Sequence, residues 1–210
     1  LPFTIEKEFA DSPGCVNGPV NRGAKGFCST NPLANCSIAY NEGIFVGYRW
    51  YDHEHIQPLF PFGYGLSYTT FKYSHLKLSA TRLSSDGSLT VAFTIKNTGK
   101  VAGAEIAQLY LQEPNSGVER PVKELKGFQR VFLQPGKSAT VELSLDPKAL
   151  AYWDVATHDW QVEPGKYDIL AGSSSSDLPL AASFDFQKAS ENSILQRRKG
   201  DGGLLHESHI

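Results

Sequence analysis

Apolar and polar side chains alternate along residues 76–187. The alternation is clearest from Leu89 to Ile95, where every second residue is apolar, and it stops at Asn97-Thr98-Gly99. Successive side chains of a strand point to opposite faces, so this pattern predicts strands that bury one face. Further runs of this kind are Ile106–Leu111, Phe128–Leu133, Ala139–Leu145, Tyr167–Ala171 and Leu180–Phe186.

Turn-forming residues separate these runs at regular intervals. Gln134-Pro135-Gly136-Lys137 and Glu163-Pro164-Gly165 are the clearest turns, because proline and glycine favour the backbone angles that turns require. Short strands with regular turns are typical of an antiparallel β-sandwich, in which each sheet packs one face on the core. We therefore predict a mainly β fold and assign residues 76–187 to one such sandwich.

Residues 44–75 concentrate aromatic side chains at a spacing that is neither helical nor strictly alternating. Pro58, Pro61 and Gly63 interrupt the stretch. A covered aromatic ring buries on the order of 150–250 Å², so we expect this segment to form a strap between two domains, held by its rings. The residues expected at that interdomain contact are Tyr48, Arg49, Trp50, Tyr51, Phe60, Phe62 and Tyr64.

Loop-forming residues occupy the two ends of the chain. Residues 1–43 are rich in glycine, asparagine, proline and serine, which predicts mainly loop. This segment could not bury enough apolar surface to fold alone. Residues 188–210 are polar, and this composition predicts a disordered tail.

All three cysteines, Cys15, Cys28 and Cys36, lie in the first of these segments. In an oxidising compartment we expect one disulfide among them and one thiol left over; a reduced cytosolic protein with three ordinary thiols is the alternative. Asn35-Cys36-Ser37 is the one N-glycosylation sequon, which makes Asn35 the candidate acceptor and favours secretion.

Composition excludes some partners. The chain has 40% hydrophobic and 20% charged residues, which is ordinary for a soluble globular protein. Its formal charge of -2 and isoelectric point near 6.3 give no reason to expect nucleic acid or an anionic membrane as a partner. The chain contains no methionine and its start lacks the pattern of a signal peptide, so we expect a processed product or a fragment.

Several longer motifs resemble those of glycoside hydrolase family 3 β-glucosidases, and they occur in the order of that family. Leu1–Ile5 resembles the strand that leads out of the family's α/β sandwich domain, and Glu42–Asp52 resembles a signature near the end of that domain. Pro58–Thr69 resembles the segment that follows. Arg120–Phe128 and Ala151–Asp154 resemble motifs of its fibronectin type III-like domain.

The resemblance implies a division into domains. Residues 1–43 would be a loop-rich remnant of the α/β sandwich domain, 44–75 the interdomain strap, and 76–187 a sandwich of the fibronectin-III or immunoglobulin-like type. The tail from Lys188 onward matches nothing in the family. It is either a genuine extension or a misread splice or frame in the gene.

The resemblance also implies where the chemistry lies. A retaining glycosidase needs a nucleophilic carboxylate and an acid about 5–5.5 Å apart. In the family, an Asp of the N-terminal barrel and a Glu of the α/β sandwich supply them, and both precede Leu1. We therefore expect no catalytic residue and no cofactor or metal site in this chain. Its expected role is accessory: it would partner the catalytic domains of a secreted glycosidase that removes terminal β-linked glucose, with β-xylosidase specificity open.

The acidic residues of the chain have structural interpretations. Glu42 opens a family signature but does not correspond to the family acid. Asp52 follows Arg49 by three residues, so an ion pair or a hydrogen bond is expected. Asp154 lies at an expected junction of strand and turn, where Asp satisfies local backbone groups, and Asp159 falls in an expected hairpin loop, Thr157-His158-Asp159.

Histidine and tryptophan residues are the other candidates. His53 and His55 would lie on one side of an extended segment, and His206 and His209 are near the C-terminus, but neither pair has a convincing third metal ligand. Trp153 and Trp160 are expected to close one end of the core, and Trp50 to seat the sandwich on the catalytic domains. The alternative for each tryptophan is stacking on a sugar ring.

Two other functions remain open. The chain could be a non-enzymatic module that binds a β-glucan, an oligosaccharide or the cell wall. It could also be a truncated product without independent function, in which case the strap would leave a large apolar patch exposed.

Overall fold

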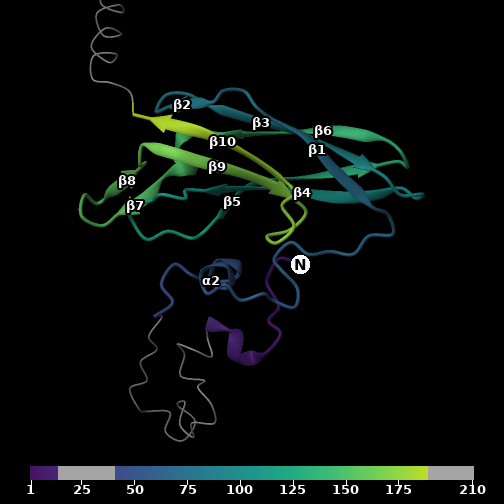
Figure 1. Ribbon diagram of the computed structural model, residues 1–210, viewed down its shortest axis with the longest axis horizontal. Coiled ribbons are helices and arrows are strands. Elements are labelled where there is room, and N and C mark those ends of the chain that lie inside the picture. The colour runs from purple at the N-terminus through teal and green to yellow at the C-terminus, as the bar shows by residue number, and fades with distance from the viewer. Residues whose placement is uncertain (14–40, 189–210) are drawn as a thin grey trace, which may run out of the picture.

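The computed structural model describes residues 1–13 and 41–188, and strands dominate them (Figure 1). The mainly β sandwich predicted from the alternating pattern is confirmed. The helices are short: η1 (Phe9–Asp11), α2 (Tyr48–His53) and η2 (Pro147–Leu150). The strands are β1 (Phe71–Leu78), β2 (Arg82–Ser84), β3 (Leu89–Asn97), β4 (Gly103–Gln112), β5 (Glu124–Leu133), β6 (Ser138–Leu145), β7 (Tyr152–Asp154), β8 (Asp159–Gln161), β9 (Gly165–Gly172) and β10 (Leu180–Gln187).

Two sheets form the layers of the sandwich. One has three strands in the order β1-β3-β6, and the other has five in the order β2-β10-β9-β4-β5. The β7–β8 hairpin forms a separate small sheet. The pairings are antiparallel except that of β10 with β2. Figure 1 shows α2 and the N-terminal segment on the outer side of the five-stranded sheet.

The core consists of the side chains that the period of two assigned to it. In β3, Leu89, Val91, Phe93 and Ile95 are each at most 1% exposed. They belong to one cluster with buried residues of β4, β6, β9 and β10. Because alternate residues of β3, β4, β6 and β9 reach this cluster, the packing of the two sheets follows directly from the sequence pattern.

Two elements differ from the sequence prediction. Tyr48–His53 forms the short helix α2 within the expected strap, and strand β1 begins at Phe71, also within it. The helix is too short to show a periodic pattern, and it starts after Gly47, whose φ of 58° suits glycine. In β1 the register shifts between Ser74 and Lys77, which breaks the alternation.

None of the described helices has the length and apolar character that a membrane crossing needs. The cysteines and Asn35 lie outside the described residues, as does the tail apart from Lys188.

A buried side chain, Asn97, ties the strap to the sandwich. Its amide nitrogen donates to the carbonyl oxygens of Val101 (2.8 Å) and Leu133 (2.9 Å). Its side-chain oxygen accepts from the Thr69 hydroxyl (2.6 Å) and the Gly99 N–H (3.0 Å). One fully buried amide therefore satisfies polar groups of three segments.

Replacing Asn97 by alanine is expected to lower the free energy of unfolding by about 2–4 kcal/mol, because buried donors and acceptors lose their partner. Urea unfolding would measure the loss. Lys96→Ala, at the exposed neighbouring position of β3, is the control and should change stability by less than about 0.5 kcal/mol. Equal effects of the two substitutions would contradict this role of Asn97.

Candidate interdomain site

Helix α2 packs on the start of β5, where three consecutive residues, Lys123, Glu124 and Leu125, each contact a different residue of the helix. Lys123 Nζ lies 2.6 Å from Asp52 Oδ2, and Arg49 Nη2 lies 3.3 Å from Glu124 Oε1. The Leu125 N–H donates to the Tyr48 hydroxyl oxygen at 2.9 Å. We call these three contacts the α2–β5 seam. They fix both the distance and the direction of α2, because each joins a specific pair of atoms.

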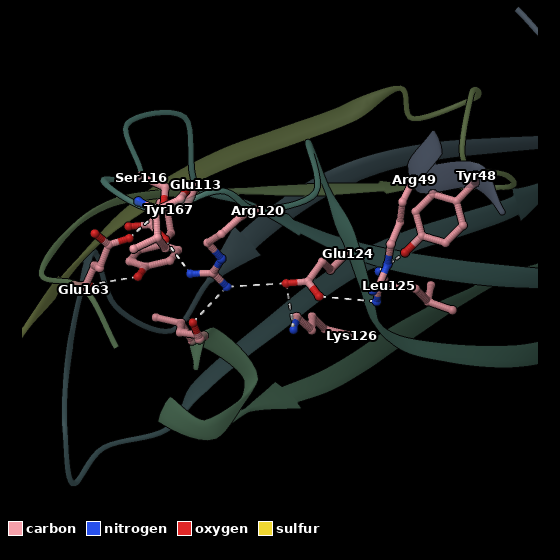
Figure 2. A network of polar contacts seen from close by, with 12 residues as sticks. Tyr48, Arg49, Glu113, Ser116, Arg120, Glu124, Leu125, Lys126, Glu163 and Tyr167 are labelled. Carbon is pink, nitrogen blue, oxygen red and sulfur yellow. Dashed lines mark hydrogen bonds and ion pairs between the residues drawn. The ribbon is translucent and has the colours of Figure 1, made fainter. Parts of the chain in front are cut away.

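Behind the seam, a polar network continues from Glu124 into the sandwich (Figure 2). Glu124 Oε2 lies 3.3 Å from Arg120 Nη2 and 3.2 Å from Lys126 Nζ. Arg120 also pairs with Glu113 and donates to the Leu150 carbonyl oxygen at 3.0 Å. The Arg120 and Glu113 side chains are only 8% and 6% exposed. The planar guanidinium has five N–H donors in a fixed fork, so it can reach acceptors in more directions than the three donors of a lysine ammonium.

Glu163 organises the other side of this region (Figure 2). Its carboxylate accepts from the Ser116 hydroxyl (2.6 Å) and the Gly117 N–H (3.0 Å). The Tyr167 hydroxyl donates to the Glu163 carbonyl oxygen at 2.8 Å. The loop between β4 and β5 is thereby tied to the start of β9.

Burial dominates the electrostatics of these groups. It raises the pKa of the Glu113 carboxyl more than the Arg120 charge lowers it. It also raises the pKa of Asp52, against the hydrogen bond and charge of Lys123. It lowers the pKa of the Lys126 ammonium although Glu124 acts in the opposite direction. The network is thus a desolvated set of charges that depend on one another.

Aromatic rings support the seam. The Tyr48 ring meets Phe62 at 5.3 Å and stands edge-on to Tyr110 at 5.7 Å between centroids. The Tyr110 hydroxyl donates to Gln108 Oε1 at 2.6 Å. Gly63 covers Gln108 so closely that a Cβ would lie 2.1 Å from its Nε2, and its φ is 84°. Only glycine fits at that crossing of strap and sheet.

The other residues expected at the interdomain contact lie elsewhere in the strap. Trp50 and Tyr51 are buried in a small cluster with Phe45, and the Trp50 indole donates to the Asp11 carbonyl oxygen at 2.9 Å. Burial raises the pKa of the Tyr51 hydroxyl to about 12, with Glu6 and Asp11 adding to the shift.

Phe60 packs on Tyr64 at 4.9 Å. The Phe60 backbone bridges to Ile5 in the N-terminal segment. Two layers therefore form: Tyr48, Arg49 and Phe62 face the sandwich, while Trp50 and Phe60 hold the N-terminal segment.

Asp52 forms the ion pair expected of it, but its partner is not the nearby Arg49. Asp52 pairs with Lys123 and Arg49 pairs with Glu124, so the two residues of α2 do not bind each other. Sequence reasoning also missed Arg120 and Glu113 as a buried pair. The charged run Arg120–Lys126 was a signal of family membership, but a local pattern does not show which distant acid a basic residue meets.

The sequence matches the fibronectin type III-like domain family over residues 105–175. It is 50% identical over 146 residues to the thermostable β-glucosidase B of Acetivibrio thermocellus, covering 70% of this chain and 19% of that protein. It is 42% identical over 186 residues to a β-glucosidase of Bacteroides ovatus, covering 89% and 24%. The structure matches a family 3 β-glucosidase of Bifidobacterium adolescentis with a TM-score of 0.75 and 36% identity, covering 88% and 25%.

The chain corresponds to the C-terminal portion of a glycoside hydrolase family 3 protein. It spans about a fifth to a quarter of the length of these relatives. The α2–β5 seam therefore lies within a part of the family 3 architecture and joins the segment before the fibronectin-III-type sandwich to the sandwich itself.

In this family 3 portion, His53 and Glu42 make local packing and turn contacts. His53 ends α2, so it does not lie in an extended segment with His55 as expected. Its ring stacks on Phe45 at 3.8 Å between centroids. Glu42 lies in the turn before α2, where its carbonyl oxygen accepts from the Phe45 N–H at 3.0 Å. Within residues 1–13 and 41–188, no group of three His, Cys, Asp or Glu residues could hold a metal ion; His206 and His209 lie outside them.

The β7–β8 hairpin corrects the expectation for two tryptophans. Trp153 and Trp160 are directly opposite each other and form an edge-to-face pair with centroids 5.6 Å apart. They are 49% and 63% exposed, so they pack on each other and do not close the core. Asp154 accepts from the Ala156 N–H at 3.0 Å, which is the local backbone role expected for it.

Replacing Arg120 by alanine is expected to lower the free energy of unfolding by about 3–5 kcal/mol, because it leaves the buried Glu113 carboxylate without its cation. Thermal or urea unfolding would measure this change. Lys166→Ala removes a more exposed pair with Asp168 (3.7 Å) and should cost less than about 1 kcal/mol. A loss for Arg120→Ala as small as that for Lys166→Ala would show that the network is dispensable.

Proposed function

We propose that this chain is the accessory C-terminal part of a β-glucosidase-type hydrolase and holds its catalytic domains in position. The whole enzyme would hydrolyse terminal β-D-glucosyl residues. The observation that carries the proposal is the α2–β5 seam, in which Asp52, Arg49 and Tyr48 each meet a different residue of the sandwich.

The physical reason is the demand that catalysis places on geometry. A misplacement of about 1 Å at reacting groups can cost a hundredfold in rate. The segment that carries α2 resembles the end of the domain that supplies the family's acid. Directional contacts from that segment to a rigid sandwich would limit its motion more strongly than apolar contacts alone, since ion pairs specify their partners.

The proposal also covers where the enzyme acts: it would be secreted. A secreted, glycosylated enzyme fits the sequon at Asn35 and the three cysteines near it. The partners of this chain would be the catalytic domains of its own polypeptide, with a β-glucan or oligosaccharide as substrate of the whole.

A chimaera tests the accessory role. The matching segment of the Acetivibrio thermocellus relative would be replaced by this chain, and release of nitrophenol from an aryl β-glucoside would be measured. We expect turnover by the chimaera and none by the 210-residue chain alone. Turnover by the chain alone would place the chemistry on one of its own carboxylates, such as Glu42, Asp52 or Asp154, and a folded but inactive chimaera would refute the accessory role.

The seam itself is tested by exchanging one charge pair within the chimaera. Lys123→Asp and Asp52→Lys should each lower kcat by roughly tenfold or more, because like charges then face each other across the seam. The double variant restores opposite charges and should recover much of kcat, with KM little changed throughout. Independent losses that add in the double variant would show that the pair does not act as a unit.

The Trp153–Trp160 pair favours a second candidate, a non-enzymatic carbohydrate-binding module. Two indoles that are 49% and 63% exposed offer flat aromatic faces on which a pyranose ring can stack. Retention of the chain on insoluble β-glucan, lost in Trp160→Ala and kept in Phe128→Ala, would support this function. Passage of all three proteins without retention would contradict this second function.

A further inference from the structure

The two outer faces of the sandwich differ in chemistry. On the three-stranded sheet, outward residues of β3 and β6 pair as Thr90 with Ser144, Thr94 with Thr140, and Lys96 with Ser138. This face is polar and suits contact with water.

On the five-stranded sheet, β4 and β5 place Ile106 opposite Arg130 and Phe132 opposite Ala104. Phe128, Phe132 and Ile106 are 68%, 59% and 47% exposed. An antiparallel sheet that leaves aromatic side chains outward indicates a covering partner.

This apolar face continues a surface that is already covered. Phe128 is directly opposite Gln108, and residues directly opposite each other share a face. Gln108 is only 3% exposed because the strap lies over it at Gly63. The strap and α2 thus cover one part of the outer face. The covered part ends between Gln108, which is buried, and its neighbour Phe128, which is exposed. We call the uncovered part, formed by Ile106, Phe128, Arg130 and Phe132, the β4–β5 face.

A groove of about 870 Å³ runs between this face and the strap. Ile106 and Arg130 line it from the sheet, and Tyr64 and Leu66 line it from the strap. Leu66 is 89% exposed. Arg130 makes no salt bridge within the described part of the chain. Lys72, Glu105 and Asp177 also line the groove, so it suits a segment with apolar side chains and charged groups of both signs.

We propose that the β4–β5 face and its groove are the docking surface for the preceding, catalytic part of the same polypeptide. The inference rests on the proposed function and names the surface through which it works. The strap, which would lead out of that catalytic part, already covers one part of the face. One interface would therefore extend across the whole outer face. A second copy of the chain would have no such continuity with the strap.

Radical footprinting of side chains tests the proposal on the 210-residue chain and on the chimaera. In the chain alone, Phe128 and Phe132 should be labelled readily. In the chimaera their labelling should fall several-fold, while that of Val155, 72% exposed on the β7–β8 hairpin, should not. Because only labelling is compared, an active chimaera with unchanged labelling of Phe128 and Phe132 would overturn this inference and leave the proposed function standing.

Substitution gives a second measurement. Phe128→Asp should leave the melting temperature of the isolated chain nearly unchanged, since the side chain is exposed there, but should lower the temperature at which the chimaera loses activity. Val155→Asp is the matched control and should alter neither. Protection of Phe128 already in the isolated chain, together with a mass that doubles with concentration, would assign the face to a second copy and refute the proposal.

Discussion

The buried guanidinium of Arg120 is the group on which the polar organisation of the molecule depends. A charge removed from water costs several kcal/mol unless acceptors replace its hydration. Glu113, Glu124 and the Leu150 carbonyl oxygen replace it here, and the Tyr152 ring lies 5.8 Å below. Because these groups come from the loop after β4, the start of β5, η2 and β7, satisfying one side chain holds one end of the sandwich together.

The position of α2 follows from this arrangement. Glu124 shares its carboxylate among Arg120, Lys126 and Arg49, so the network that closes the sandwich also binds the helix outside it. Lys123 and Leu125, on either side of Glu124, add contacts to Asp52 and Tyr48. A helix of six residues has little stability of its own. Its place is therefore set by the sandwich, which is the property expected of a support for a neighbouring domain.

The sandwich leaves apolar side chains exposed on one of its outer faces. The polar face of β3 and β6 meets water, whereas the β4–β5 face presents Phe128 and Phe132 beside the strap. The exposed tryptophans of the β7–β8 hairpin form a separate surface. Tyr152, also in this hairpin, has its ring under the Arg120 guanidinium. The two surfaces belong to different sheets and serve different proposals, so substitutions can test them independently.

The amino-acid sequence by itself determined the family and those strands that alternate with a period of two. Alternation at a period of two is local, so Leu89–Ile95 and Ala139–Leu145 could be assigned to the core without knowing their partners. Long motifs such as Arg120–Phe128 identified the family because their residues occur in an unusual order.

Tertiary structure alone decided the pairing of Asp52 with Lys123, the folding of Tyr48–His53 as a helix, and the exposure of Trp153 and Trp160. Each of these depends on which distant segment lies opposite. A residue's own neighbours in the chain carry no information about that, because ion pairs and burial are set by chain packing between residues far apart in sequence.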